Sequence, residues 1–173
     1  MRSVLPFLFV AIISLSCSQI AFACVCGGEP GKRSDAQIKA AIAKEFNESP
    51  SVFSGEVIAR DMLTVKFRII TMWKGDALDE FTMSTGTVKL GEDSYRSSSC
   101  DYNFKVGEKY LVYARWAENN QLIAQSCTRT TVLSKGQLDF QELDILNPNA
   151  YHVPALPPSS GLVDRALMRR RHA

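Results

Sequence analysis

The residues of this chain that could do chemistry are its cysteines. Cys24 and Cys26 are separated by one residue, and Cys100 and Cys127 follow far along the chain. Cysteine side chains can join as disulfides or, as thiolates, hold a metal ion such as Zn²⁺. The ligands of a four-thiolate site are usually closely and regularly spaced in sequence. The wide, uneven spacing here therefore favours disulfides, which form in an oxidising compartment.

Residues 1–23 indicate export to such a compartment. Arg2 precedes an apolar run over residues 5–15, and the segment closes on Ala21-Phe22-Ala23. This order is typical of a secretory signal peptide, and the run is too short for a stable membrane anchor. Acylation of Cys17 or Cys24 is a weaker alternative, because neither has leucine three residues before it. We expect a secreted protein, extracellular or periplasmic, whose mature chain begins at Cys24.

Cleavage after Ala23 removes Cys17 and leaves an even number of cysteines, which predicts disulfides. A bond between Cys24 and Cys26 would be strained, since only one residue separates them. Two pairings remain open: Cys24–Cys100 with Cys26–Cys127, or Cys24–Cys127 with Cys26–Cys100. In both, the first mature residue is bonded to the second half of the domain, so its α-amine is held in place.

The spacing of apolar residues predicts a helix near each end of the domain. Residues 34–37 have capping-box form, and Ile38, Ile42 and Phe46 follow on one helical face, ending near Pro50. Residues 134–137 repeat the capping-box form and open a second helix through residue 146.

Between the helices the apolar period changes to two, which predicts strands. The expected strands are residues 52–59, 64–70, 80–84, 109–116 and 122–125, with a turn at 73–76 and a polar loop at 86–99. A mainly β domain of five short strands with a helix near each end is typical of a five-stranded barrel of the oligonucleotide/oligosaccharide-binding (OB) type. A split sandwich fits the same strands.

The domain should span residues 24–147. Residues 148–173 contain several prolines and end in Arg169-Arg170-Arg171-His172-Ala173, which predicts a flexible tail. The net charge is +2, but Arg2 and the arginines of the tail account for it, so the domain itself is close to neutral. Without a basic face, the domain is not expected to bind nucleic acid.

The composition also argues against an enzyme. The two histidines, His152 and His172, both fall in the expected tail, which removes the commonest general base and zinc ligand from the domain. Asp76, Asp79 and Glu80 cluster beside a turn, where solvated carboxylates are the simpler interpretation. We therefore expect a binding protein without a cofactor.

Several motifs, in order and at consistent spacing, resemble the tissue inhibitors of metalloproteinases and their netrin-like inhibitory domain. The C-x-C at the expected cleavage site, followed by two further cysteines, is the most specific of them. The motifs are Cys24-Val25-Cys26, residues 52–58, residues 65–75, Ser97-Ser98-Ser99-Cys100, residues 106–113, Ser126-Cys127 and Gln137-Leu138.

The resemblance implies an OB-type barrel, the disulfides Cys24–Cys100 and Cys26–Cys127, and inhibition of a zinc metalloproteinase. By resemblance, the α-amine and carbonyl oxygen of Cys24 would chelate the zinc of the protease, so that Cys24 meets a metal only in trans. Val25 would enter the main specificity pocket, and Cys26, Ser98 and Ser99 would complete the set of protease-binding residues.

The stretch after Cys26, residues 27–30, departs from the usual continuation of the family. The alternative function is therefore a secreted netrin-like interaction or structural module without protease inhibition. In that case the disulfides only hold the N-terminus in place.

Overall fold

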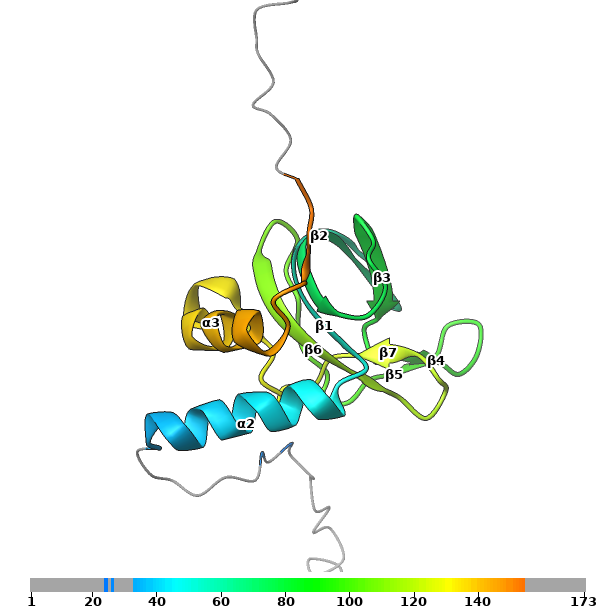
Figure 1. Cartoon of the computed structure of the whole chain (residues 1–173). Helices are drawn as coiled ribbons and strands as arrows, with labels where there is room; N and C mark the ends of the chain where they lie inside the picture. The colour runs from blue at the N-terminus through cyan, green and yellow to red at the C-terminus, as the bar shows by residue number, and fades with distance from the viewer. Residues whose placement is uncertain (1–23, 25, 27–32, 155–173) are drawn as a thin grey trace, which may run out of the picture.

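The computed structural model describes Cys24, Cys26 and residues 33–154. This part of the chain is mainly β, with one helix before the strands and one after most of them (Figure 1). The predicted fold class is confirmed at this level. The expected signal segment, residues 1–23, lies outside the described residues.

Helix α2 (Asp35–Glu48) begins at the predicted capping box. The Ser34 hydroxyl accepts a hydrogen bond from the Gln37 amide at 3.3 Å, and the Gln37 side chain accepts one from the Ser34 amide at 2.9 Å. The helix ends where Ser49 turns extended, because Pro50 disfavours helical geometry in the residue before it. Lys74 then donates to the carbonyl of Phe46, which ties this end of α2 to the sheet.

Helix α3 (Gln137–Leu146) ends as predicted but begins differently. Its N-cap is Gly136, and no side chain caps it. Ser134 instead lies within a short 3₁₀ turn, η1 (Leu133–Lys135), so the predicted second capping box is wrong. A side chain at position 136 would press on Leu111, with a Cβ placed 3.2 Å from its side chain, which favours glycine there.

The strands form one antiparallel sheet in the order β3-β2-β1-β6-β7, with β8 added to β6 and β9 added to β2. A separate hairpin pairs β4 with β5, inside the segment expected to be a loop. The strands are β1 (Ser51–Arg60), β2 (Thr64–Lys74), β3 (Glu80–Ser84), β4 (Val88–Lys89), β5 (Tyr95–Arg96), β6 (Lys109–Trp116), β7 (Leu122–Ile123), β8 (Thr131–Val132) and β9 (Tyr151–His152).

The sheet curls strongly but does not close. Strands β3 and β7 lie at opposite ends of the strand order and come near each other without forming a ladder (Figure 1). Register shifts between β1 and β2, one of them at Ser54/Gly55, bend the pair. Where a five-stranded OB-type barrel, closed or nearly closed, was expected, the structure has an open, curled sheet with additional short strands.

Two apolar clusters cover the two faces of this sheet. Phe53, Phe67 and Phe104 lie on the inner face, where their rings meet edge to face with centroids 5.0–5.2 Å apart. Trp73 and Leu143 belong to the second cluster, between the sheet and the two helices. Because successive side chains of a strand face opposite sides, β1 and β6 are buried on both faces.

The segment after α3 is folded onto the sheet. Strand β9 pairs with β2, Val153 donates to the Ile70 carbonyl at 3.1 Å, and the Val153 side chain packs against the inner cluster. The Tyr151 hydroxyl donates to Asp79 at 2.9 Å. The expected tail therefore does not start at residue 148, and His152 belongs to the folded part. The sequence signal was too weak to find because β9 is only two residues long.

No helix in the described part of the chain is long and apolar enough to cross a membrane.

Truncating the chain tests whether β9 is docked on the sheet. Ending the chain after Ala150 removes β9 and Val153, and should lower the free energy of unfolding by about 2 kcal/mol, from one partly buried side chain and its hydrogen bonds. Urea unfolding would measure it. Ending the chain after Pro154 retains these contacts and is the matched control. Equal stability of the two truncated chains would contradict the docking of β9.

Candidate functional site

The four cysteines expected in the mature chain meet at one edge of the domain. Cys24 is bonded to Cys100 and Cys26 to Cys127, with Cα–Cα distances of 5.1 and 5.0 Å, within the usual range for disulfides. Of the two pairings that the sequence left open, the structure has the one that the resemblance implied.

Backbone pairing between two loops brings Cys100 and Cys127 together. The Ser126 amide donates to the Cys100 carbonyl at 2.7 Å, and Asp101 forms a bridge with Gln125. This short antiparallel contact joins two segments that are distant in sequence, residues 100–101 and 125–126. It places both cysteines beside each other, within reach of the C-x-C segment.

A tight turn over residues 98–101 presents the next predicted site residues. The Asp101 carboxylate accepts from the Ser98 amide at 2.7 Å, and the Ser98 hydroxyl accepts from the Cys100 amide at 3.1 Å. Gly86 packs against this carboxylate so closely that any Cβ would collide with it, and its φ of +91° also favours glycine. Gly86 and Asp101 were not predicted to belong to the site. The only feature of the sequence that pointed to them is a glycine in a polar loop.

The structure gathers the predicted site residues that it describes. Cys24 is partly buried, Cys26 is exposed, and Ser98 and Ser99 are exposed on the turn that ends at Cys100. Val25 lies outside the described residues. The N-terminal cysteines and the 98–100 turn thus form one exposed edge, which we name the cysteine edge: Cys24, Cys26, Ser98, Ser99 and Cys100.

A groove of about 700 Å³ adjoins the cysteine edge on the side of the β4–β5 and β6–β7 hairpins. Ser98 and Ser99 line it together with Trp116, whose side chain is 61% exposed. An exposed indole beside hydroxyl groups offers both an apolar surface and hydrogen-bonding partners to a ligand. The groove extends the area that a partner at the cysteine edge could contact.

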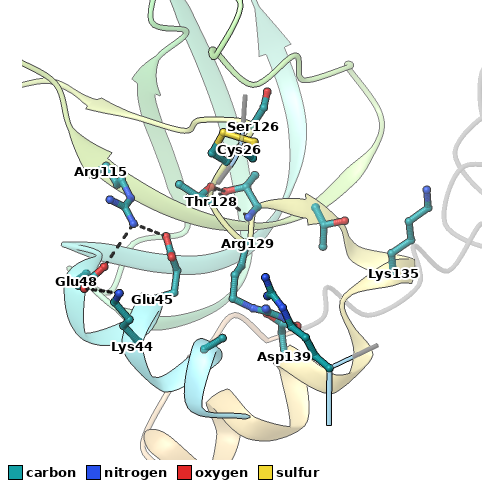
Figure 2. A pocket seen from close by; sticks show the side chains of 15 residues that line it. Cys26, Lys44, Glu45, Glu48, Arg115, Ser126, Thr128, Arg129, Lys135 and Asp139 are labelled. Carbon is teal, nitrogen blue, oxygen red and sulfur yellow. Dashed lines mark hydrogen bonds and ion pairs between the residues drawn. A yellow bond between two sulfur atoms is a disulfide. The ribbon is translucent and has the colours of Figure 1, made fainter. Parts of the chain in front are cut away.

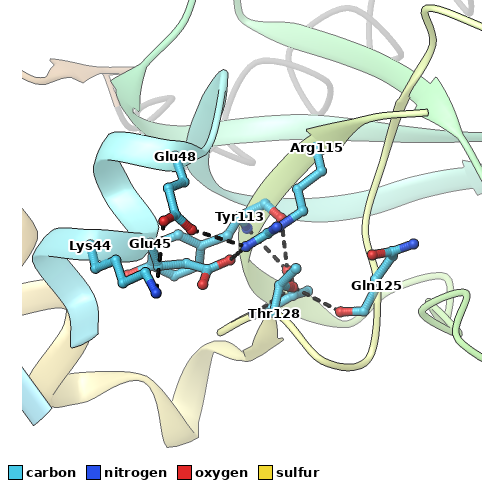
Figure 3. A network of polar contacts seen from close by, with 8 residues as sticks. Lys44, Glu45, Glu48, Tyr113, Arg115, Gln125 and Thr128 are labelled. Atoms are coloured by element: carbon cyan, nitrogen blue, oxygen red, sulfur yellow. Dashed lines mark hydrogen bonds and ion pairs between the residues drawn. The ribbon is translucent and has the colours of Figure 1, made fainter. Parts of the chain in front are cut away.

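A second groove, of about 1000 Å³, lies on the other side, between α2, β6 and α3 (Figure 2). The Cys26–Cys127 disulfide lines it, and most of its other side chains are polar or charged. Many of these charges are already engaged. Arg115 pairs with Glu45 at 2.8 Å, and Lys44 and Glu48 lie beside them (Figure 3).

The same groove contains an ion pair between the partly buried Arg129 and the buried Asp139. Arg129 donates two hydrogen bonds of 2.6 Å to the two oxygens of Asp139, and the Tyr113 hydroxyl donates to the same carboxylate at 3.0 Å. The hydrogen bonds to Asp139 raise the pKa of the Arg129 guanidinium. Burial, followed by the negative charge of Asp139, raises the pKa of the Tyr113 hydroxyl. The triad joins α3, β6 and the loop after Cys127.

Two threonines attach the same loop to β6. The Thr128 hydroxyl lies within hydrogen-bond distance of two acceptors, the Gln125 carbonyl at 2.8 Å and the Thr130 hydroxyl at 2.9 Å (Figure 3). The Thr130 hydroxyl in turn accepts from the Tyr113 amide at 3.0 Å. Contacts within this second groove therefore hold the loop after Cys127 in position. By fixing this loop, they also fix Cys127 beside the cysteine edge.

No protein-family model and no curated protein matches the chain.

Removing one partner of the Arg129–Asp139 pair tests this support. Asp139→Ala leaves a largely buried guanidinium unpaired, and should lower the free energy of unfolding by about 3 kcal/mol. The exposed pair of Lys66 and Glu80 provides the control: Glu80→Ala should cost less than about 1 kcal/mol. Both are measured by urea unfolding. Similar losses in the two variants would mean that the buried pair does not anchor α3 and the loop.

Proposed function

We propose that the protein is a secreted inhibitor of zinc metalloproteinases that binds through the cysteine edge. One observation carries the proposal. Cys24, the first residue of the expected mature chain, is bonded to Cys100 at the end of the turn that exposes Ser98 and Ser99. A newly formed N-terminus would ordinarily be mobile. Here it is joined to a turn that is itself fixed by Asp101 and Gly86.

A fixed N-terminal amine suits the chemistry of a catalytic zinc. Such a zinc has three protein ligands and an open position occupied by water or substrate. The α-amine and carbonyl oxygen of Cys24 are two neutral donors on one residue, and they would fill that position in trans. An α-amine has a pKa of about 7.7–8.0, so a useful fraction is neutral and able to coordinate at neutral pH.

The neighbouring residues would supply the rest of the contact. Val25 follows Cys24 directly and would occupy the main specificity pocket of the protease. Ser98 and Ser99 would lie along the same cleft, since the Cys24–Cys100 disulfide connects their turn to the N-terminus. Trp116, on the adjoining groove, offers an apolar contact farther from the zinc.

The fold and the disulfides support the same proposal. The curled sheet, with β3 and β7 near each other, is compatible with an open variant of an OB-type barrel of the netrin-like kind. Two disulfides between distant segments suit an oxidising compartment, extracellular or periplasmic. In this account the protein acts by binding and has no cofactor or catalytic residue of its own.

Extending the N-terminus by one residue tests the proposal. One alanine before Cys24 displaces the chelating amine while both disulfides can still form. Because zinc ligands lie at about 2.0–2.2 Å, the displacement should abolish inhibition of a panel of zinc endopeptidases. Val25→Gly is the graded comparison, and should weaken inhibition by roughly 1.5–3 kcal/mol, the contribution of one buried side chain.

The controls separate mechanism from folding and from the alternative function. N-terminal sequencing must find Cys24 first in the wild-type protein, and circular dichroism must be the same for the three forms. Equal inhibition by the wild-type and extended proteins would rule out chelation by the amine. Absence of inhibition by the wild-type protein across the panel would favour a netrin-like interaction module without protease inhibition.

A further inference from the structure

The sulfur atoms of Cys24, Cys26, Cys100 and Cys127 lie closer together than two independent disulfides require. Cys24 Sγ is 3.6 Å from Cys127 Sγ, although these atoms belong to different disulfides. The sulfurs of Cys24, Cys26 and Cys127 all lie within 4.8 Å of one another. The fourth sulfur, of Cys100, is not one of this group of three but is bonded to that of Cys24. The two disulfides therefore form a single cluster of sulfur atoms.

The distance between the two disulfides is close to that between sulfur ligands in a metal centre, and reduction would free the two bonded pairs of sulfurs to separate. A Zn²⁺ ion with four thiolate ligands has Zn–S distances of about 2.3 Å in a tetrahedron, which separates the sulfurs by roughly 3.8 Å. We propose that reduction of both disulfides converts Cys24, Cys26, Cys100 and Cys127 into a site for one Zn²⁺ ion. This site is distinct from the zinc of a target protease, which would meet the Cys24 amine and carbonyl.

The conversion is chemically balanced. Each disulfide takes two electrons and two protons from a dithiol, which itself becomes a disulfide, so two disulfides yield four thiols. Binding of Zn²⁺ then deprotonates the four thiols and releases four protons, and four Zn–S bonds replace two S–S bonds. Cys26 is exposed, so the reductant and the metal can reach the cluster from solvent.

Two of the four ligands are held in place without any disulfide. The hydrogen bond from the Ser126 amide to the Cys100 carbonyl, at 2.7 Å, joins the loops that carry Cys100 and Cys127. Thr128 fixes the second of these loops through the Gln125 carbonyl. The other two ligands, Cys24 and Cys26, are one residue apart, so the metal has to order only one short segment.

The surroundings favour the charge of such a centre. Four thiolates and one Zn²⁺ carry a net charge of −2. Cys26 and Cys127 line the charged groove, and Arg33, Arg129 and Lys135 line it as well (Figure 2). Within the described part of the chain, Arg33 and Lys135 make no ion pair, so their charges remain to balance a dianionic centre.

Zn²⁺ would therefore take over the structural role of the two disulfides. Reduction alone frees the N-terminal segment, and Zn²⁺ joins it again to the same two loops. The exported, oxidised protein and a reduced, zinc-bound protein would share one fold, with different chemistry at Cys24.

Zinc titration of the reduced protein tests the proposal. The mature chain is reduced without oxygen by a phosphine, which becomes a phosphine oxide with oxygen from water, and is then titrated with Zn²⁺ against a chromophoric chelator. One Zn²⁺ per chain should bind, and Co²⁺ in its place should give the visible spectrum of a tetrahedral thiolate site. Zinc should also raise the melting temperature of the reduced chain or, if that chain is unfolded, restore its near-ultraviolet circular dichroism.

Cys100→Ser should weaken zinc binding at least roughly 10- to 100-fold, since even residues that only orient a metal ligand have effects of this size. Ser94→Ala, at an exposed position between β4 and β5, is the control and should leave it unchanged. A stoichiometry below one, equal affinity of Cys100→Ser and wild type, or no effect of zinc on folding would overturn the proposal. The inhibition assay uses the oxidised protein, so either proposal can fail while the other stands.

Discussion

The convergence of three distant chain segments on one cluster of sulfurs is the constraint on which the rest of this structure depends. The disulfides span 76 and 101 residues. Closing loops of this length stabilises the fold by about 4.5 kcal/mol each in the chain-entropy model. The cysteines alone do not bring the segments together. The pairing of residues 100–102 with 124–126 orients Cys100 and Cys127, and the disulfides then attach the N-terminus to that pair.

The remaining architecture keeps those loops in place. The central strands β1 and β6 are buried on both faces, so the sheet that carries the loops is enclosed by apolar side chains. On the helical side, the Arg129–Asp139 pair and the Tyr113 hydroxyl connect α3, β6 and the Cys127 loop. Buried ion pairs contribute little net stability, but each partner is costly to lose. Here the Arg129–Asp139 pair holds the loop after Cys127 in a single position.

The sequence predicted the elements whose signal is local. The capping box at Ser34 and the alternation in β1, β2 and β6 were strong enough to place α2 and the main strands. Features that depend on tertiary contacts were not predicted from the sequence. Strand β9 exists because β2 offers a free edge, and Gly136 replaces Ser134 as the cap because Leu111 packs against it. Gly86 and Asp101 matter only once the turn beside Cys100 is formed, and the opening between β3 and β7 is a property of the whole sheet.

The pairing of the cysteines is the central claim, since the exposed N-terminal edge and the sulfur cluster both follow from it. Non-reducing peptide mapping of the exported protein, with free thiols alkylated before digestion, measures it directly. Because Cys24 and Cys26 remain in one peptide, digestion gives a single product of three linked peptides, and partial reduction with differential alkylation then assigns each bond. We expect Cys24 to be linked to Cys100 and Cys26 to Cys127, with no alkylated thiol among these four in the native protein. Recovery of Cys24–Cys127 with Cys26–Cys100, or of two or more free thiols in native protein, would contradict it.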